Sequence, residues 1–314
     1  MRTKMIPSDL LMNALTYSNM LVLMSLGLTF SYITLKVPNF AQGDFIAIGA
    51  YIAYTSYIFW NLHPYLSIPS AFLISGGISL LMFLFIFSPL SKKGFKVTDL
   101  MIAYFAAEMI IRSALLIYTD YMQRTFSKYF SNILIPLNQV RVGDYSIPFP
   151  LLISSILTIT ILFSFLIVLN YTKLGISLRA AIQNPELAKT YGVNVERVYA
   201  ISWFLAGGIT GMTGPVIVTF FPTDPNIGWT FLVRIFAASI VGGIDSLLGA
   251  VIGGFFVGIS EVTGIYVLSQ PPIGLQPVYR VAIPFILMII ALLFMPRGIV
   301  SSIDRAIIRL REKK

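Results

Sequence analysis

Long apolar runs recur along this chain, each close to the length that a helix needs to cross a bilayer. About 20 predominantly apolar residues are enough for one crossing. Hydrophobic residues make up 57% of the 314 residues and charged residues only 11%, about half the charged fraction of a soluble domain. The runs therefore predict an all-α, polytopic integral membrane protein with about eight or nine transmembrane helices, some of them broken or half-length.

The side chains that carry most enzyme chemistry are scarce in this chain. It has no cysteine and one histidine, His63, which stands in an expected loop. Disulfides and thiolate chemistry are therefore excluded, and an embedded enzyme would need clustered nucleophiles, acids or metal ligands. We expect a chain that is not an enzyme and holds no metal or cofactor of its own.

The net charge of +9 is explained by the distribution of charge that is typical of membrane proteins. Cytoplasmic loops of membrane proteins carry an excess of Lys and Arg, so the charge does not predict a nucleic-acid partner. Basic residues gather in four places that we assign to the cytoplasmic face: Lys36, 92–96, 171–197 and a basic tail at 297–314. The side of the N-terminus stays open, because Arg2 and Lys4 oppose this count.

A polar interlude at 171–198 separates two apolar runs. Asn184 followed by Pro185 predicts a helix start, because Asn caps free backbone N–H groups and proline suits the first turn. Gly192 predicts the stop, and a second short helix is expected at Ser177–Gln183. With Ala and Leu on one side and charge on the other, the two helices predict a cytoplasmic docking surface. An ordinary amphipathic loop is the alternative.

Two apolar runs are interrupted by glycine and polar residues. Half-helices broken in this way are common around transport pathways, and small residues let helices pack closely. A membrane-edge turn is the alternative for the first interruption. We take as pathway or helix-break candidates Asn39, Gln42, Gly43 and Asp44 in the first run, and Gly242, Gly243, Asp245 and Gly249 in the second.

Four charged residues fall inside expected spans. Glu108 and Arg112 are four positions apart, so they can pair on one helix face. Arg234 and Glu261 lie in later spans. Ionisable residues at this depth usually face the protein interior and are functional candidates. A structural ion pair that closes two helices together is the alternative.

Three segments resemble one known family. The run PNFAQGDFIAIGAYIAY, the interlude LGISLRAAIQNPELAKTYGVNVERV and the broken region IVGGIDSLLGAVIGGFFVGISE resemble, in that order, segments of the permeases of branched-chain amino acid ABC transporters. The interlude resembles the coupling loop of that family. Asp245 departs from the family pattern, which more often has glycine there. The motifs specify the class of transporter better than the solute.

The resemblance implies one transmembrane domain, 1–314, with the ABC importer permease fold, in the cell membrane of a prokaryote. It implies import of a small polar solute, with branched-chain amino acids as the leading solute class. Implied partners are two ATP-binding cassette ATPases, a second homologous permease and an extracytoplasmic solute-binding protein. The chain lacks a GxxxxGK[ST] phosphate loop, so ATP and Mg²⁺ would bind in the ATPases. The residues that the resemblance implies for contact with the ATPase subunits are Arg179, Ala180, Asn184, Pro185, Glu186, Ala188 and Gly192.

Other transporters use similar features. An ion-coupled secondary transporter or a channel would also have broken helices and intramembrane charges. It would depend on charges such as Glu108 and Glu261 and not on the cytoplasmic loop. Within the same family, permeases for urea and amides, nucleosides or sugars are further alternatives.

Overall fold

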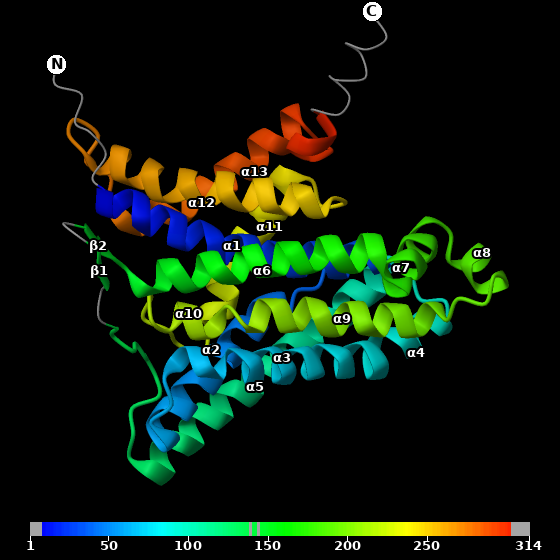
Figure 1. Cartoon of the computed structure of the whole chain (residues 1–314), viewed down its shortest axis with the longest axis horizontal. Helices are drawn as coiled ribbons and strands as arrows, with labels where there is room; N and C mark the ends of the chain where they lie inside the picture. The colour runs from blue at the N-terminus through cyan, green and yellow to red at the C-terminus, as the bar shows by residue number, and fades with distance from the viewer. Residues whose placement is uncertain (1–7, 138–139, 143–144, 303–314) are drawn as a thin grey trace, which may run out of the picture. The chain divides into compact units, whose positions relative to one another are not determined.

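The computed structural model describes residues 8–137, 140–142 and 145–302. The regular elements of these residues are helices apart from one antiparallel hairpin, β1 (Val140–Val142) with β2 (Tyr145–Ile147) (Figure 1). Within them, seven helical segments are long and apolar enough to cross a membrane: Ser8–Leu35, Pro64–Lys92, Val97–Phe126, Phe149–Tyr171, Val195–Ile217, Leu247–Ser269 and Pro277–Ser302. Two further helices, α2 (Gln42–Trp60) and α11 (Ile227–Gly242), are more polar or shorter. The chain is an all-α, multi-pass membrane protein.

The chain divides into two compact units. The first unit comprises the described residues within Met1–Ser25, Leu137–Thr158 and Val233–Lys314. The second unit comprises Leu26–Pro136 and Ile159–Leu232. Helices α1 (Ser8–Leu35), α6 (Phe149–Tyr171) and α11 each contribute to both. The single domain expected for 1–314 stays a prediction.

Helices α3 (Ile68–Met82) and α9 (Val195–Gly211) lie side by side in the second unit (Figure 1). Small residues bring them together: a Cβ added to Gly207 would lie 2.8 Å from Ser79 Oγ, and one added to Gly211 would lie 3.1 Å from the Ala71 carbonyl oxygen. Such contacts are typical of closely crossing membrane helices. Gly207 and Gly211 have the GxxxG spacing that permits this close crossing.

The small residues of α2 also allow close packing against neighbouring helices. A Cβ on Gly43 would lie 2.7 Å from the carbonyl carbon of Gly228, and one on Gly49 would lie 2.8 Å from that of Gly211. The first half of α2 is buried within the second unit. This half of α2 therefore packs against other helices of the second unit.

Two helices of the second unit differ in extent from the apolar runs of the sequence. Helix α9 begins before the apolar run at 199–220, because the side chain of Asn194 caps it by accepting from Arg197 N at 3.0 Å. This run is also interrupted after Gly211, and a short helix, α10 (Gly214–Ile217), follows. Helix α5 (Val97–Phe126) continues past Tyr118 into more polar sequence.

The remaining helices of the second unit extend or continue the long spans. They are η1 (Pro64–Ser67), η2 (Phe83–Phe87), α4 (Ser88–Lys92), α7 (Lys173–Gln183) and α8 (Pro185–Thr190). Helices η1, α3, η2 and α4 follow one another without a break, so they form one span. The short helices α7 and α8 lie between the spans of α6 and α9, which makes them the candidate coupling segment.

Helix α12 (Leu247–Ser269) of the first unit packs on the first half of α1. A Cβ on Gly254 would lie 2.8 Å from Val22 Cα, and one on Gly258 would lie 2.8 Å from Ser18 Cα. Ala250 belongs to the same stripe, and its carbonyl accepts from Ser25 Oγ at 3.0 Å. These small residues of α12 therefore form a helix-packing surface.

The C-terminal part of the first unit adds η3 (Pro277–Val281) and α13 (Ala282–Phe294), which contact α12. Helix α13 ends just before Pro296, as expected. Most of the basic tail predicted at 297–314, together with Arg2 and Lys4, lies outside the described residues.

Candidate functional site

The candidate coupling segment forms the two short helices α7 and α8 (Figure 1). Asn184 caps α8, its side chain accepting from Leu187 N at 3.0 Å, and Pro185 is the first helical residue. Gly192 has a φ of 81°, a left-handed conformation that glycine adopts without strain. These predicted boundaries are confirmed, although α7 begins at Lys173, four residues before the expected start.

The exposed surface of α8 differs from the predicted amphipathic pattern. Ala188 is buried, whereas its neighbour Leu187 is 53% exposed. Tyr191, just beyond α8, is 81% exposed. Successive helical residues point about 100° apart, so Ala188 can be buried while Leu187 protrudes, but this spacing does not say which of the two is buried. The protruding apolar groups, Leu187 and Tyr191, were missed.

Several predicted coupling residues hold the segment together. Arg179 donates a hydrogen bond to the Leu169 carbonyl of α6, and Tyr199 of α9 donates to the Ala181 carbonyl of α7 at 3.1 Å. Ala180 is half-buried, and Glu186 is exposed and pairs with Lys189 at 2.8 Å. The segment is thus attached to α9 and presents α8 outward.

The polar turn before α2 is enclosed by protein. Asn39, Gln42 and Asp44 are all buried. The Asn39 side chain accepts from Ala41 N at 3.1 Å. Gln42 Nε2 donates to the Ala206 carbonyl of α9 at 3.1 Å and also contacts the Thr210 hydroxyl. The turn is therefore tied to the same helix that carries the coupling segment.

Three charged side chains meet beside this turn, and we call Asp44, Glu108 and Arg112 the charged triad. Arg112 forms the predicted ion pair with Glu108 on α5, and its Nε lies 3.8 Å from Asp44 Oδ1. Its guanidinium carbon lies 4.9 Å from the Trp229 ring centroid, within the range of a cation–π contact. The meeting of Asp44 with Arg112 was not predicted from the sequence.

The glycine-rich break at 242–249 is a tight turn in the first unit. Gly243 has a φ of 117°, and the side chain of Ser246 caps α12 by accepting from Gly249 N at 3.1 Å. A Cβ on Gly249 would lie 2.7 Å from the Gly242 carbonyl oxygen. The predicted break is confirmed, and its glycines allow backbone to meet backbone. The Asp245 side chain is exposed.

Glu261 lies at the centre of a buried cluster in the first unit. Its Oε1 accepts from Arg234 Nε at 3.0 Å and from Arg280 Nε at 2.7 Å, and its Oε2 accepts from the Tyr17 hydroxyl at 2.6 Å. Arg280 also lies over the Tyr17 ring, 4.5 Å from its centroid. Arg234 and Glu261 were predicted separately as intramembrane charges, whereas Arg280 and Tyr17 were missed.

Comparisons with known proteins agree with this geometry. Residues 10–292 match the family described as "Branched-chain amino acid transport system / permease component". The probable branched-chain amino acid transport permease protein LivH of Methanocaldococcus jannaschii is 38% identical over 92% of this chain and 91% of its own. BraD of Pseudomonas aeruginosa, a high-affinity branched-chain amino acid transport system permease protein, is 23% identical over 93% and 94%.

A sugar permease matches a smaller part of the chain. The xylose/arabinose import permease protein XylH of Sulfolobus acidocaldarius is 32% identical over 29% of this chain and 28% of its own. By contrast, the family match extends from α1 to α13 and includes the polar turn, the coupling segment and the glycine-rich break. The chain therefore belongs to the family of permease components of branched-chain amino acid transport systems.

Proposed function

We propose that this chain is the membrane-spanning permease subunit of an ABC importer that moves branched-chain amino acids across the cell membrane of a prokaryote. Two ATPase subunits would bind ATP and Mg²⁺ and drive transport. A second homologous permease would complete the pathway, and an extracytoplasmic binding protein would deliver the solute. This chain would need no cofactor of its own.

The exposed surface of α8 is the observation that supports the ATPase partner. Leu187 and Tyr191 protrude as apolar groups, and Asn184 and Gly192 fix the two ends of the helix. Exposed apolar groups rimmed by polar residues mark protein interaction sites. The basic residues of this segment favour the cytoplasmic face, where ATP would be available to a partner.

A continuous set of hydrogen bonds supports the mechanical role of this surface. Motion of α8 would reach α7, and Tyr199 joins α7 to α9. Farther along α9, Ala206 and Thr210 hold the side chain of Gln42. A force applied at α8 would therefore reach the polar turn through one rigid helix. Coupling of this kind requires contiguous elements that can move together.

Co-purification tests the partner. The chain would be co-expressed with candidate ATPases, as the unaltered protein, as a Leu187→Asp, Tyr191→Asp double variant and as a Leu66→Asp control. Leu66 is 67% exposed in η1, outside the coupling segment. We expect the ATPase to co-purify with the unaltered chain and the control only. Equal binding by the double variant would contradict the proposed surface.

Uptake tests the solute. Cells that express the complete importer would be assayed for uptake of labelled leucine, with unlabelled isoleucine, valine, xylose and urea as competitors. The similarity to LivH over most of the chain supports competition by isoleucine and valine. Competition by xylose or urea alone would instead favour one of the other solute classes.

A further inference from the structure

The charged triad contains buried polar atoms that no described residue satisfies. Asp44 and Glu108 are each 1% exposed. Glu108 Oε1 and Arg112 Nη2 pair with each other, but no described residue makes a hydrogen bond to Asp44 Oδ2, Glu108 Oε2 or Arg112 Nε. Buried polar groups are normally hydrogen-bonded, and each exception calls for an explanation.

The unsatisfied atoms include both hydrogen-bond acceptors and hydrogen-bond donors. The two carboxylates offer acceptors, and the guanidinium offers donors. A bare cation would satisfy the acceptors only, and an anion would satisfy the donors only. Among the described residues, no three His, Cys, Asp or Glu side chains gather as metal ligands would. A zwitterion satisfies both, because its ammonium group donates and its carboxylate can pair with arginine.

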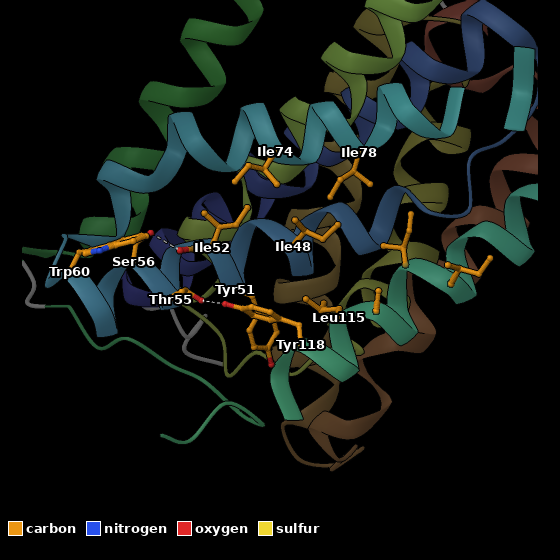
Figure 2. Close-up of a pocket in the computed structure, with 13 residues that line it drawn as sticks. Ile48, Tyr51, Ile52, Thr55, Ser56, Trp60, Ile74, Ile78, Leu115 and Tyr118 are labelled. Carbon is orange, nitrogen blue, oxygen red and sulfur yellow. Dashed lines mark hydrogen bonds between the residues drawn. The ribbon is translucent and has the colours of Figure 1, made fainter. Parts of the chain in front are cut away.

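An apolar pocket begins one helical turn from the triad. It lies between α2, α3 and α5 and has a volume of about 530 Å³ (Figure 2), within the range of about 300–1,000 Å³ for small-molecule sites. Ile48 lines it and follows Asp44 by one turn of α2. Ile111 and Leu115 line it on α5, on either side of Arg112 along the chain.

The lining of the pocket restricts what can enter it. No charged side chain lines it, and two of its polar groups, the hydroxyls of Thr55 and Tyr118, hydrogen-bond each other at 2.6 Å (Figure 2). The pocket alone is therefore unsuited to a zwitterion but suited to an aliphatic side chain. The charged triad matches the ammonium and carboxylate groups of an aliphatic amino acid, and the neighbouring isoleucines of the pocket match its side chain.

We propose that the charged triad and this pocket form a solute site in the permease. The carboxylates of Asp44 and Glu108 bind the ammonium group of the amino acid, and the guanidinium of Arg112 binds its carboxylate. The aliphatic side chain enters the pocket between α2, α3 and α5. Trp229 holds the guanidinium plane in position. This assignment rests on the proposed transport of branched-chain amino acids and adds which residues recognise them.

Thermal stabilisation by analogues tests this site without any transport assay. The assembled importer would be placed in lipid nanodiscs without its binding protein and titrated with leucine, leucinol or 4-methylpentanoate. Leucinol lacks the carboxylate, and 4-methylpentanoate lacks the ammonium group. A ligand that binds only the folded state raises Tm, and at a fixed concentration the rise is larger for a tighter ligand because the stabilisation grows with the logarithm of [L]/Kd. We expect leucine to raise Tm and each analogue to bind about tenfold more weakly or worse.

Substitutions in the charged triad test whether the rise in Tm with leucine comes from binding to this chain. Asp44→Asn and Arg112→Gln should weaken leucine binding about tenfold or more. Asp120→Asn is the control, because Asp120 lies on the same helix but is exposed and pairs with Arg124. An unchanged leucine response in both triad variants would overturn the proposal. So would an absent leucine response, or equal responses to leucine and both analogues.

A change in the pocket wall keeps the test decisive if the triad variants do not fold. Ile74 lines the pocket and is 47% exposed, whereas its neighbour Leu73 is 59% exposed and does not line it. Ile74→Trp should weaken the response to leucine, and Leu73→Trp should leave it unchanged. Equal responses in these two variants would overturn the assignment of the pocket.

Leucine uptake by the same proteins, reconstituted with the binding protein in proteoliposomes, separates the two proposals. If the unaltered importer takes up leucine but the triad and pocket variants bind and transport leucine normally, only the assignment of the site fails. If the unaltered importer does not take up leucine at all, the proposed function fails, whatever the thermal response shows.

Discussion

Gln42 donates a hydrogen bond from Nε2 to the backbone carbonyl of Ala206 at 3.1 Å, although the two residues are 164 positions apart. This bond joins the first turn of α2 to the middle of α9. Both groups are buried, so water cannot replace the bond when it is lost. The polar turn is thus rigidly attached to α9, and it should move whenever α9 moves.

Removing this link should separate transport from assembly. Gln42→Ala should lower the free energy of unfolding by about 1–3 kcal/mol and reduce leucine uptake, while the ATPase still co-purifies because α7 and α8 are unchanged. Gln276→Ala, at an exposed position of the first unit, is the control. Normal uptake by Gln42→Ala would show that the link does not carry motion.

The glycine-rich break should tolerate no side chain. Gly243→Ala places a Cβ on a residue with a φ of 117°, and Gly249→Ala overlaps the Gly242 carbonyl. Each should destabilise the protein by about 1–3 kcal/mol, through backbone strain in the first case and overpacking in the second. Thermal unfolding in detergent would measure both changes.

Gly77→Ala is the matched control for these substitutions. An added Cβ at Gly77 meets nothing within 4 Å, and the residue lies inside α3. Alanine is favoured over glycine in a helix by about 1 kcal/mol, so Tm should stay level or rise. A fall in Tm equal to that of Gly249→Ala would contradict the packing argument.

The Glu261 cluster should respond unequally to loss of its members. Glu261→Gln leaves Arg234 and Arg280 without their buried counter-charge, which should cost about 3–5 kcal/mol. Tyr17→Phe removes one hydrogen bond to the carboxylate and should cost about 1–3 kcal/mol. Tyr171→Phe, at a residue that is 84% exposed, should change nothing. Equal Tm values for all three variants would refute the role of the cluster.

The cap of α8 should matter for binding more than for global stability. Asn184→Ala removes the acceptor for Leu187 N, at a cost of about 0.5–2 kcal/mol to this helix. Because α8 is an exposed six-residue helix, the loss should appear as weaker ATPase binding with little change in Tm. Asn184→Asp keeps the cap and should bind normally. Failure of Asn184→Asp to bind would point to direct contact by the amide instead.

Local chemistry explains which features could be predicted from the sequence. The cap at Asn184, the left-handed residue at Gly192 and the break at Gly243 depend on neighbouring residues only. Small-residue spacings on α2, α9 and α12 identify faces that pack closely, because that spacing depends only on helix geometry. Each of these features is present in the structure.

Features that join distant segments could not be predicted in the same way. Nothing in the sequence pairs Asp44 with Arg112, 68 positions later, or brings Arg280 and Tyr17 to Glu261. These contacts depend on how the helices pack in three dimensions. The same limit explains the burial of Ala188, whose contacts come from the fold of the whole coupling segment.

Leucine uptake by the purified importer in proteoliposomes, with ATP supplied or withheld on the side of the ATPases, tests the proposed function most directly. Uptake should require ATP and should be abolished by the Leu187→Asp, Tyr191→Asp double variant. Uptake that proceeds without ATP, is driven by a proton or sodium gradient and persists in this variant would contradict it.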